Sequence, residues 1–222
     1  MKSKYLLLLP ALILLAQTAG QAQDKTILYN YGHHEQHGDL AICRESGQLD
    51  AYDGAKVTGY NNTVIKAYDN CQVDAFGNCQ VTANAKVKVK AYDNARVFAN
   101  NSSDVDAVGS AYIQAIHQSS VTGHGNVAIV ANGNVTVKAY DNCNVVASGR
   151  ARVEAYGNAT VMLHGNATAI AHDNSTINAY DKATVTANDK ANVEAFDEST
   201  VTATKDVHVE KHDSAKLTIS KI

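Results

Sequence analysis

The sequence is poor in the residues that build or interrupt an ordinary mixed core. Among 222 residues there is no tryptophan, there are three phenylalanines, and the single proline is Pro10. Because proline cannot donate a hydrogen bond to a β-ladder, the chain after Pro10 can carry such a ladder without a break. Alanine, valine, asparagine and aspartate dominate instead, so we expect a regular fold with small aliphatic side chains inside.

The N-terminal residues have the features of an export signal. Lys2 and Lys4 precede an apolar run that ends at Ala16, and small residues surround a cleavage site after Ala22. The apolar run is shorter than the ~20 residues that a spanning helix needs. We therefore predict a signal peptide over residues 1–22, a secreted, periplasmic or cell-surface location, and no membrane-spanning segment after its removal.

The charge of the mature chain argues against a nucleic-acid partner. Removal of residues 1–22 takes two lysines from 19 basic and 22 acidic residues, which leaves 17 against 22, or a net charge of −5. A nucleic-acid-binding surface requires a basic stripe, and this chain is mildly acidic.

The chain repeats every eight residues from Ala55 to the last residue. Residues 55–222 are 168 residues, or 21 octads of eight, without an insertion or deletion. When Ala55 is the first place, the third place is aliphatic and larger than alanine in 20 of 21 octads, and the fifth is alanine or glycine in 18. The second and fourth places are mostly polar. This alternation predicts a short strand with one buried face in every octad.

Each octad ends in residues that favour a turn. Pairs such as Asp69-Asn70 and Gly157-Asn158 occupy the seventh and eighth places, where left-handed backbone conformations cost little. Because every strand has the same inward chemistry, stacked coils fit better than a meander of hairpins. We predict an all-β fold: a single β-solenoid over residues 55–222, with residues 23–54 as an N-terminal cap.

The sixth place indicates how many octads make one coil. Aromatic rings recur there at sixteen-residue intervals in three groups: Tyr60, Phe76 and Tyr92; Tyr140 and Tyr156, followed by His172; and Tyr180 and Phe196, followed by His212. A sixteen-residue coil of two octads is therefore favoured over a triangular coil of twenty-four. The repeat region then makes about eleven coils around a flattened valine and alanine core. Outward rings on adjacent coils should stack into ladders.

The octad written Ala-Tyr-Asp-Asn-Cys-x-Val, from Ala139 to Val145, is similar to the Gly-Tyr-Gly-Ser-Thr-x-Thr repeat of bacterial ice-nucleation proteins. The resemblance implies a sixteen-residue β-solenoid with tyrosine ladders. Those proteins show Thr-x-Thr in coil after coil, whereas here residues 184–186 and 200–202 are the clear rows. The resemblance therefore concerns architecture, and ice binding is a weaker alternative.

The outward rings are the candidate ligand-binding residues. Aromatic columns with polar neighbours could receive a glycan or another extended, repetitive component of a cell surface. The candidates are Tyr60, Phe76, Tyr92, Tyr140, Tyr156, Tyr180 and Phe196.

A second candidate site lies before the repeats. His33, His34 and His37 offer imidazole ligands beside Glu35, a set that suits a transition metal. Their spacing matches no standard site, and surface histidines without a ligand are the alternative. We predict no cofactor.

Three of the four cysteines occupy the first place of their octads: Cys71, Cys79 and Cys143. In a sixteen-residue coil, the first places of successive octads lie at opposite ends of the flat section. We therefore predict buried, small, apolar thiols and no disulfide among them. Cys43 lies outside the repeat, and its state stays open.

The function predicted from these features is an exported, non-enzymatic structural or surface-display rod. A binding module for a repetitive ligand is the alternative, and ice binding or a polysaccharide-active enzyme are weaker ones. An enzyme is disfavoured because no octad carries an insertion that could wall a cleft. Nothing like the N-terminal cap follows the last octad, so we also expect a homodimer through the C-terminal edge.

Overall fold

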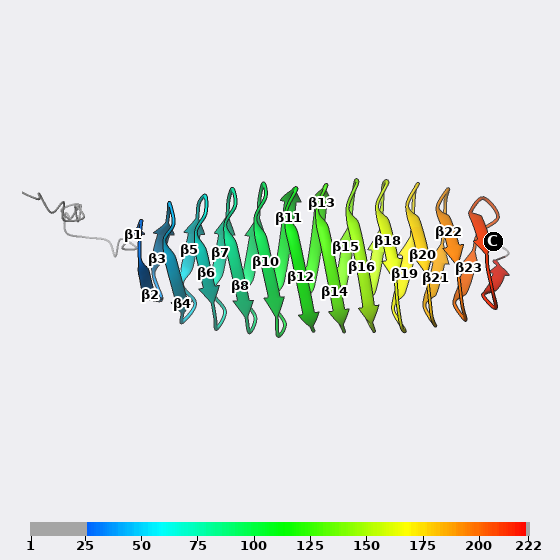
Figure 1. Ribbon diagram of the computed structural model, residues 1–222, viewed down its shortest axis with the longest axis horizontal. Coiled ribbons are helices and arrows are strands. Elements are labelled where there is room, and N and C mark those ends of the chain that lie inside the picture. Colours follow the sequence, from blue (N-terminus) through cyan, green and yellow to red (C-terminus); the bar gives the residue numbers. More distant parts are fainter. Residues whose placement is uncertain (1–25, 221–222) are drawn as a thin grey trace, which may run out of the picture.

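The computed structural model describes residues 26–220 as an elongated stack of β-strands, seen side by side along the long axis in Figure 1. The predicted signal peptide lies outside the described residues. No helix in the described part of the chain is long and apolar enough to cross a membrane.

Residues 26–220 form 25 strands that alternate between two sheets, and every strand pairing among them is parallel. Sheet A holds β1 (Thr26–Tyr29), β3 (Leu40–Cys43), β5 (Lys56–Gly59), β7 (Gln72–Ala75), β9 (Lys88–Ala91), β11 (Asp104–Gly109), β13 (Ser120–Gly125), β15 (Thr136–Ala139), β17 (Arg152–Ala155), β19 (Thr168–Ala171), β21 (Thr184–Ala187), β23 (Thr200–Ala203) and β25 (Lys216–Ile219). Sheet B holds β2 (His33–His37), β4 (Gln48–Tyr52), β6 (Val64–Ala67), β8 (Gln80–Asn84), β10 (Arg96–Asn100), β12 (Tyr112–His117), β14 (Ala128–Gly133), β16 (Asn144–Gly149), β18 (Thr160–Leu163), β20 (Thr176–Ala179), β22 (Asn192–Ala195) and β24 (His208–Lys211).

The pairing register confirms the predicted β-solenoid with two octads in each coil. Val57 pairs with Val73, and Val185 with Val201, each sixteen residues later. The structure has about 12 turns, compared with the eleven expected, because the segment before Ala55 is also coiled.

The interior is the flattened valine and alanine core that the pattern predicts. Third-place residues such as Val73 and Val137 are buried, as are the small residues at the first and fifth places. Two departures from the repeat are also accommodated inside, since the large Leu163 at a fifth place and the small Ala169 at a third place are both buried. Each fully buried valine contributes about 1.5–3 kcal/mol, so the long column of valines dominates the stability of the fold.

The corners of the coils use the left-handed backbone conformation that the turn residues favour. At the seventh place φ is 58° for Asp141 and 57° for Asp181, and glycine takes the same place in other coils. The aspartates also tie adjacent corners together. Asp141 Oδ2 accepts a hydrogen bond of 2.9 Å from the N–H of Gly125, and Asp181 Oδ2 accepts one of 2.8 Å from the N–H of Gly165.

The segment predicted as a cap forms strands β1 to β4, which continue both sheets with shorter coils. Thr26 pairs with Leu40 fourteen residues later, and His33 pairs with Gln48 fifteen residues later. Polar groups enter the core at this end. Gln36 is 4% exposed, and its Nε2 donates a 2.8 Å hydrogen bond to the carbonyl of Gly38.

Candidate functional site

The sixth places of the octads lie at two edges of the flattened rod. We call the row of turns that follows the strands of sheet A edge A, and the row that follows the strands of sheet B edge B. Because the register advances by sixteen residues, each sixth-place side chain lies directly over the one sixteen residues earlier. The predicted ring ladders therefore divide between the two edges.

Edge A carries two ring stacks, as predicted. Phe76 lies between Tyr60 and Tyr92, with ring centroids 5.3 and 4.6 Å away. Tyr140 and Tyr156 stack at 4.9 Å, and His172 follows at 4.7 Å.

Two members of the edge A column were not predicted. His124 stacks on Tyr140 at 4.6 Å, and the guanidinium of Arg44 lies 5.2 Å from the centroid of Tyr60. Each lies sixteen residues before a predicted ring, Arg44 before Tyr60 and His124 before Tyr140, so the interval alone could have located them. Val108 separates the two stacks and is 42% exposed.

Edge B carries the third predicted ladder and a further one near its start. Tyr180 and Phe196 stack at 4.8 Å. His164 extends the ladder at one end and His212 at the other, at 5.0 and 4.5 Å. A separate stack of His37, Tyr52 and Tyr68, with spacings of 5.1 and 4.9 Å, was missed because part of it precedes the regular repeat.

The stacked rings cover one another's faces. Within the ladders of the regular repeat the interplanar angles are 14° or less, and all rings except the exposed His212 are partly buried. A sugar usually packs on an aromatic face, and here only the ring edges and the tyrosine hydroxyls remain for a ligand.

The hydroxyl of Tyr156 takes part in a small polar network. It donates a 3.2 Å hydrogen bond to Glu154 Oε2, and Lys138 Nζ lies 3.6 Å from the same oxygen. Burial and the neighbouring carboxylate raise the pKa of Tyr156 above its usual value of 10. This phenol is therefore a poor general base near neutral pH.

The three candidate metal ligands have separate partners. His33 Nε2 lies 3.2 Å from Asp50, and His37 Nδ1 lies 2.6 Å from Asp53. His34 Nε2 lies 2.7 Å from the carbonyl oxygen of Tyr31. Across residues 26–220, no three histidine, cysteine, aspartate or glutamate side chains converge on one point. The structure thus does not bring the predicted imidazoles together.

A column of asparagines at the eighth place of edge A was also not predicted as a feature. Asn78 Nδ2 donates to Asn62 Oδ1 at 3.3 Å, and Asn158 Nδ2 donates to Asn142 Oδ1 at 3.3 Å. These amide ladders are exposed and run beside the ring ladders. They add hydrogen bonds between coils in the direction of the rod axis.

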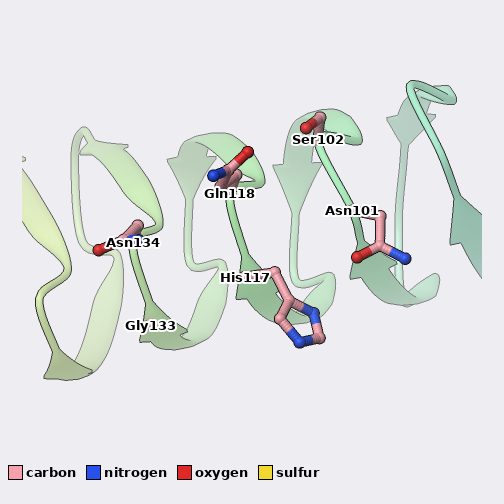
Figure 2. A pocket seen from close by; sticks show the side chains of 6 residues that line it. All are labelled: Asn101, Ser102, His117, Gln118, Gly133 and Asn134. Carbon is pink, nitrogen blue, oxygen red and sulfur yellow. The ribbon is translucent and has the colours of Figure 1, made fainter.

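Two of the hollows on the surface of residues 26–220 are lined mainly by exposed side chains. The first, of about 450 Å³, runs along edge B and is lined by Asn101, Ser102, His117, Gln118, Gly133 and Asn134. Figure 2 shows that these residues come from successive turns and project outward. His117 Nδ1 is hydrogen-bonded to Asn100 Oδ1 at 2.6 Å.

The second hollow, of about 380 Å³, lies on sheet A over β3 to β11. Its rim alternates in charge, since Lys88 and Lys90 on β9 pair in register with Asp104 and Asp106 on β11. Charges that balance across adjacent strands in this way stabilise the sheet.

The four cysteines are buried, free thiols, which confirms the prediction that those of the repeat are small apolar core residues. Burial raises the pKa of Cys43 and of Cys79 to about 11, so neither is an activated nucleophile. The sulfurs of Cys79 and Cys143 each fill the space beside a glycine. An ideal Cβ on Gly59 would lie 2.7 Å from Cys79 Sγ, and one on Gly123 would lie 3.1 Å from Cys143 Sγ.

Comparison of this chain with protein-family models, with curated proteins and with solved structures gave no match. The class of protein is therefore the one that the geometry defines, a parallel β-solenoid with sixteen-residue coils.

Proposed function

We propose that this protein is an exported structural or surface-display rod without enzymatic activity. The observation that supports it is the unbroken register, in which every coil from β3 to β25 repeats at sixteen residues with short turns at both edges. About 12 coils at ~4.8 Å give a rod of roughly 58 Å. Export rests on the predicted signal peptide over residues 1–22.

The ladders support a mechanical role. Each stacked ring pair adds ~0.5–1.5 kcal/mol between neighbouring coils beyond its buried area. The aspartate and asparagine columns add hydrogen bonds along the same axis. All of these contacts oppose bending and separation of coils, which is what a spacer requires.

The resemblance to ice-nucleation proteins belongs to this proposal as a likeness of architecture only. On sheet A, Thr184 and Thr186 pair in register with Thr200 and Thr202, so two complete Thr-x-Thr rows lie side by side. The rows on either side are incomplete, because Ile170 and Lys216 interrupt them. A template of two rows is too small to order an ice surface.

A binding module remains the second candidate, because ring columns are present on both edges. A ligand would have to use the tyrosine hydroxyls and the flanking asparagines, since the ring faces are covered. Such a ligand would be a polar, extended chain such as a glycan.

Two variants separate the rod from the binding module. Deletion of residues 97–112 removes one sixteen-residue coil in register and leaves every ring of the predicted ladders in place. The double variant Tyr140→Ser/Tyr156→Ser keeps the length and breaks a ladder. Small-angle scattering should give a maximum dimension about 5 Å shorter for the deletion only.

Binding to a glycan array then decides between the candidates. The rod proposal expects no glycan binding by the wild type and no release of reducing ends from polysaccharides. Glycan binding that survives the deletion but is lost in Tyr140→Ser/Tyr156→Ser would favour the binding module, and polysaccharide cleavage by the wild type would overturn the non-enzymatic proposal.

We also propose that the C-terminal edge associates with a second copy. Leu217 and Ile219 occupy inward-facing places on β25 but are 39% and 51% exposed. Their burial against another edge would remove apolar surface from water and pair open backbone groups. A monomeric mass at tens of micromolar would contradict this proposal.

A further inference from the structure

The two flat faces of the rod differ in chemistry. On sheet B four of the five fourth places from β10 to β18 are apolar, namely Phe98, Val130, Val146 and Met162, and Gln114 on β12 is the exception. Val146 is 41% exposed and Met162 is 37% exposed. Tyr112, at a second place on the same face, is 43% exposed. These five apolar residues, with Ala128, form what we call the apolar stripe.

The equivalent places on sheet A are charged or hydroxylated, with the exception of Ile170. Strands β11, β15 and β17 carry Asp106, Lys138 and Glu154 at the fourth place, and β19 carries Ile170. The apolar stripe is therefore not a property of the repeat itself. An exposed strip of large apolar side chains on one face only is typical of an interaction surface.

Charges of opposite sign flank the apolar stripe along the fourth-place column. Lys66 lies on β6, toward the N-terminal end, and Glu194 lies on β22, toward the C-terminal end. In the order of sheet B, β6 and β22 are each four strands from β14. Between Lys66 and Glu194 the column holds only neutral side chains, and beyond these two it is acidic at both ends, with Asp50 on β4 and Glu210 on β24.

We propose that two copies of this chain pack face to face through sheet B, as antiparallel rods. The twofold axis runs parallel to the strands at β14, so that fourth places oppose fourth places. Lys66 then faces the partner's Glu194, Phe98 faces the partner's Met162, and Val146 faces the amide of the partner's Gln114. Val130 meets its own copy at the axis, so one patch is complementary to itself, as an isologous interface requires.

The parallel arrangement of two rods lacks this complementarity. A twofold axis along the rod would place strands of equal number at the same height. Lys66 would then lie level with the partner's Lys66, and Glu194 level with the partner's Glu194. Charge complementarity therefore selects the antiparallel arrangement. At the ends of the antiparallel interface the partner's Glu210 would lie opposite Asp50. Each of these carboxylates already has a histidine at 3.2 Å: His208 beside Glu210 and His33 beside Asp50.

The size of the face predicts a weak dimer. Nine strands from β6 to β22, spaced ~4.8 Å apart and about four residues of ~3.3 Å wide, cover roughly 570 Å² per copy. A stable interface buries ~800 Å² per partner, so we expect dissociation constants in the micromolar range. This interface is separate from the end-to-end contact proposed for β25.

Sedimentation equilibrium between about 1 and 200 µM tests the proposal with a matched control. Val146→Lys and Met162→Lys should each weaken dimerisation at least about tenfold, because a charge would enter the apolar stripe. Ile170→Lys is the control, since Ile170 is also at a fourth place and is 40% exposed, but on sheet A. It should change the dissociation constant less than about twofold. Unchanged thermal unfolding of the monomers would show that all three variants fold.

A charge exchange tests the antiparallel geometry. Lys66→Glu and Glu194→Lys should each weaken the dimer, and the double variant should restore it, because the twofold axis pairs the two positions. The proposal is overturned if the wild type is monomeric throughout the range, or if the double variant is not restored. It is also overturned if Ile219→Lys abolishes the dimer while the sheet B variants leave it intact.

Discussion

Gly59 is the position where a single added methyl group tests the packing of the core most severely. An ideal Cβ there would lie 2.6 Å from Ile65 Cδ1, 2.7 Å from Cys79 Sγ and 2.9 Å from Thr63 Oγ1. Most coils carry alanine at the equivalent place, for example Ala75 on the next strand of sheet A. The glycine is therefore required by its larger neighbours and not by the fold.

The replacement Gly59→Ala should destabilise the protein by about 2 kcal/mol. Overpacking of a tight core costs ~1–3 kcal/mol, and the loss of unfolded-state entropy offsets only ~0.4–1 kcal/mol of it. Gly123→Ala is the matched control, because its nearest contacts would be 3.0 Å to Ile129 Cδ1 and 3.1 Å to Cys143 Sγ. Its cost should be smaller, about 1 kcal/mol or less.

A double-mutant cycle with Cys79→Ala isolates the contact. Removal of the sulfur relieves one of the three close contacts, so Gly59→Ala should cost at least ~0.5 kcal/mol less in the Cys79→Ala background than alone. Urea unfolding followed by circular dichroism gives the four free energies. Additive effects within ~0.3 kcal/mol, or a Gly59→Ala variant as stable as the wild type, would refute the packing described for this coil.

Three further predictions concern the edges and the thiols. Phe76→Asn removes ring stacking on both sides and should lower the free energy of unfolding, measured in urea, by ~1–3 kcal/mol. Val108→Asn, at the equivalent sixth place between the two stacks, should cost less than half as much, and equal costs would contradict a stabilising role for the rings. Asp181→Ala should lower the free energy of unfolding by ~1–2 kcal/mol, because the N–H of Gly165 loses its acceptor and an alanine must take a positive φ. Asp181→Asn should recover most of this stability, and no recovery would show that the carboxylate charge matters more than its hydrogen bond. Burial raises the pKa of the Cys43 and Cys79 thiols to about 11 from an ordinary value of 9.0, so their contribution to the free energy of unfolding should be fully present below pH 9 and lost as pH rises through 11. Cys79→Ala should flatten this decline in stability, and a wild-type urea midpoint that is unchanged between pH 8 and 10.5 would contradict the prediction.

The repeat made the fold predictable because one physical rule operates in every octad. A valine such as Val137 at the third place and small residues at the first and fifth leave one way to bury the inward face, and the turn pairs set the length of each strand. The sixteen-residue ring interval, from Tyr140 to Tyr156, then fixed two octads per coil. These features are local, so the sequence alone contains them.

The parts that escaped prediction depend on relations between coils. In the sequence His164 interrupts the alternation of edge A, whereas in the structure it begins the ladder of edge B that includes Tyr180. The coils of fourteen and fifteen residues near the N-terminus have no repeat to reveal them. The apolar stripe is visible only when alternate octads are placed on one face, since Val130, Val146 and Met162 are sixteen residues apart.

Cysteine pairing at the eighth places measures the length of a coil most directly. Asn62 and Asn78 are stacked neighbours, with 3.3 Å between their amides and a Cα separation near ~4.8 Å, which suits a disulfide. Under mild oxidation, Asn62→Cys/Asn78→Cys should form an intramolecular disulfide detectable by mass spectrometry, and Asn62→Cys/Lys86→Cys, twenty-four residues apart, should not. Cross-linking of the twenty-four-residue pair in preference to the sixteen-residue pair would contradict the two-octad coil on which the ladders, the flat faces and the proposed dimer all depend.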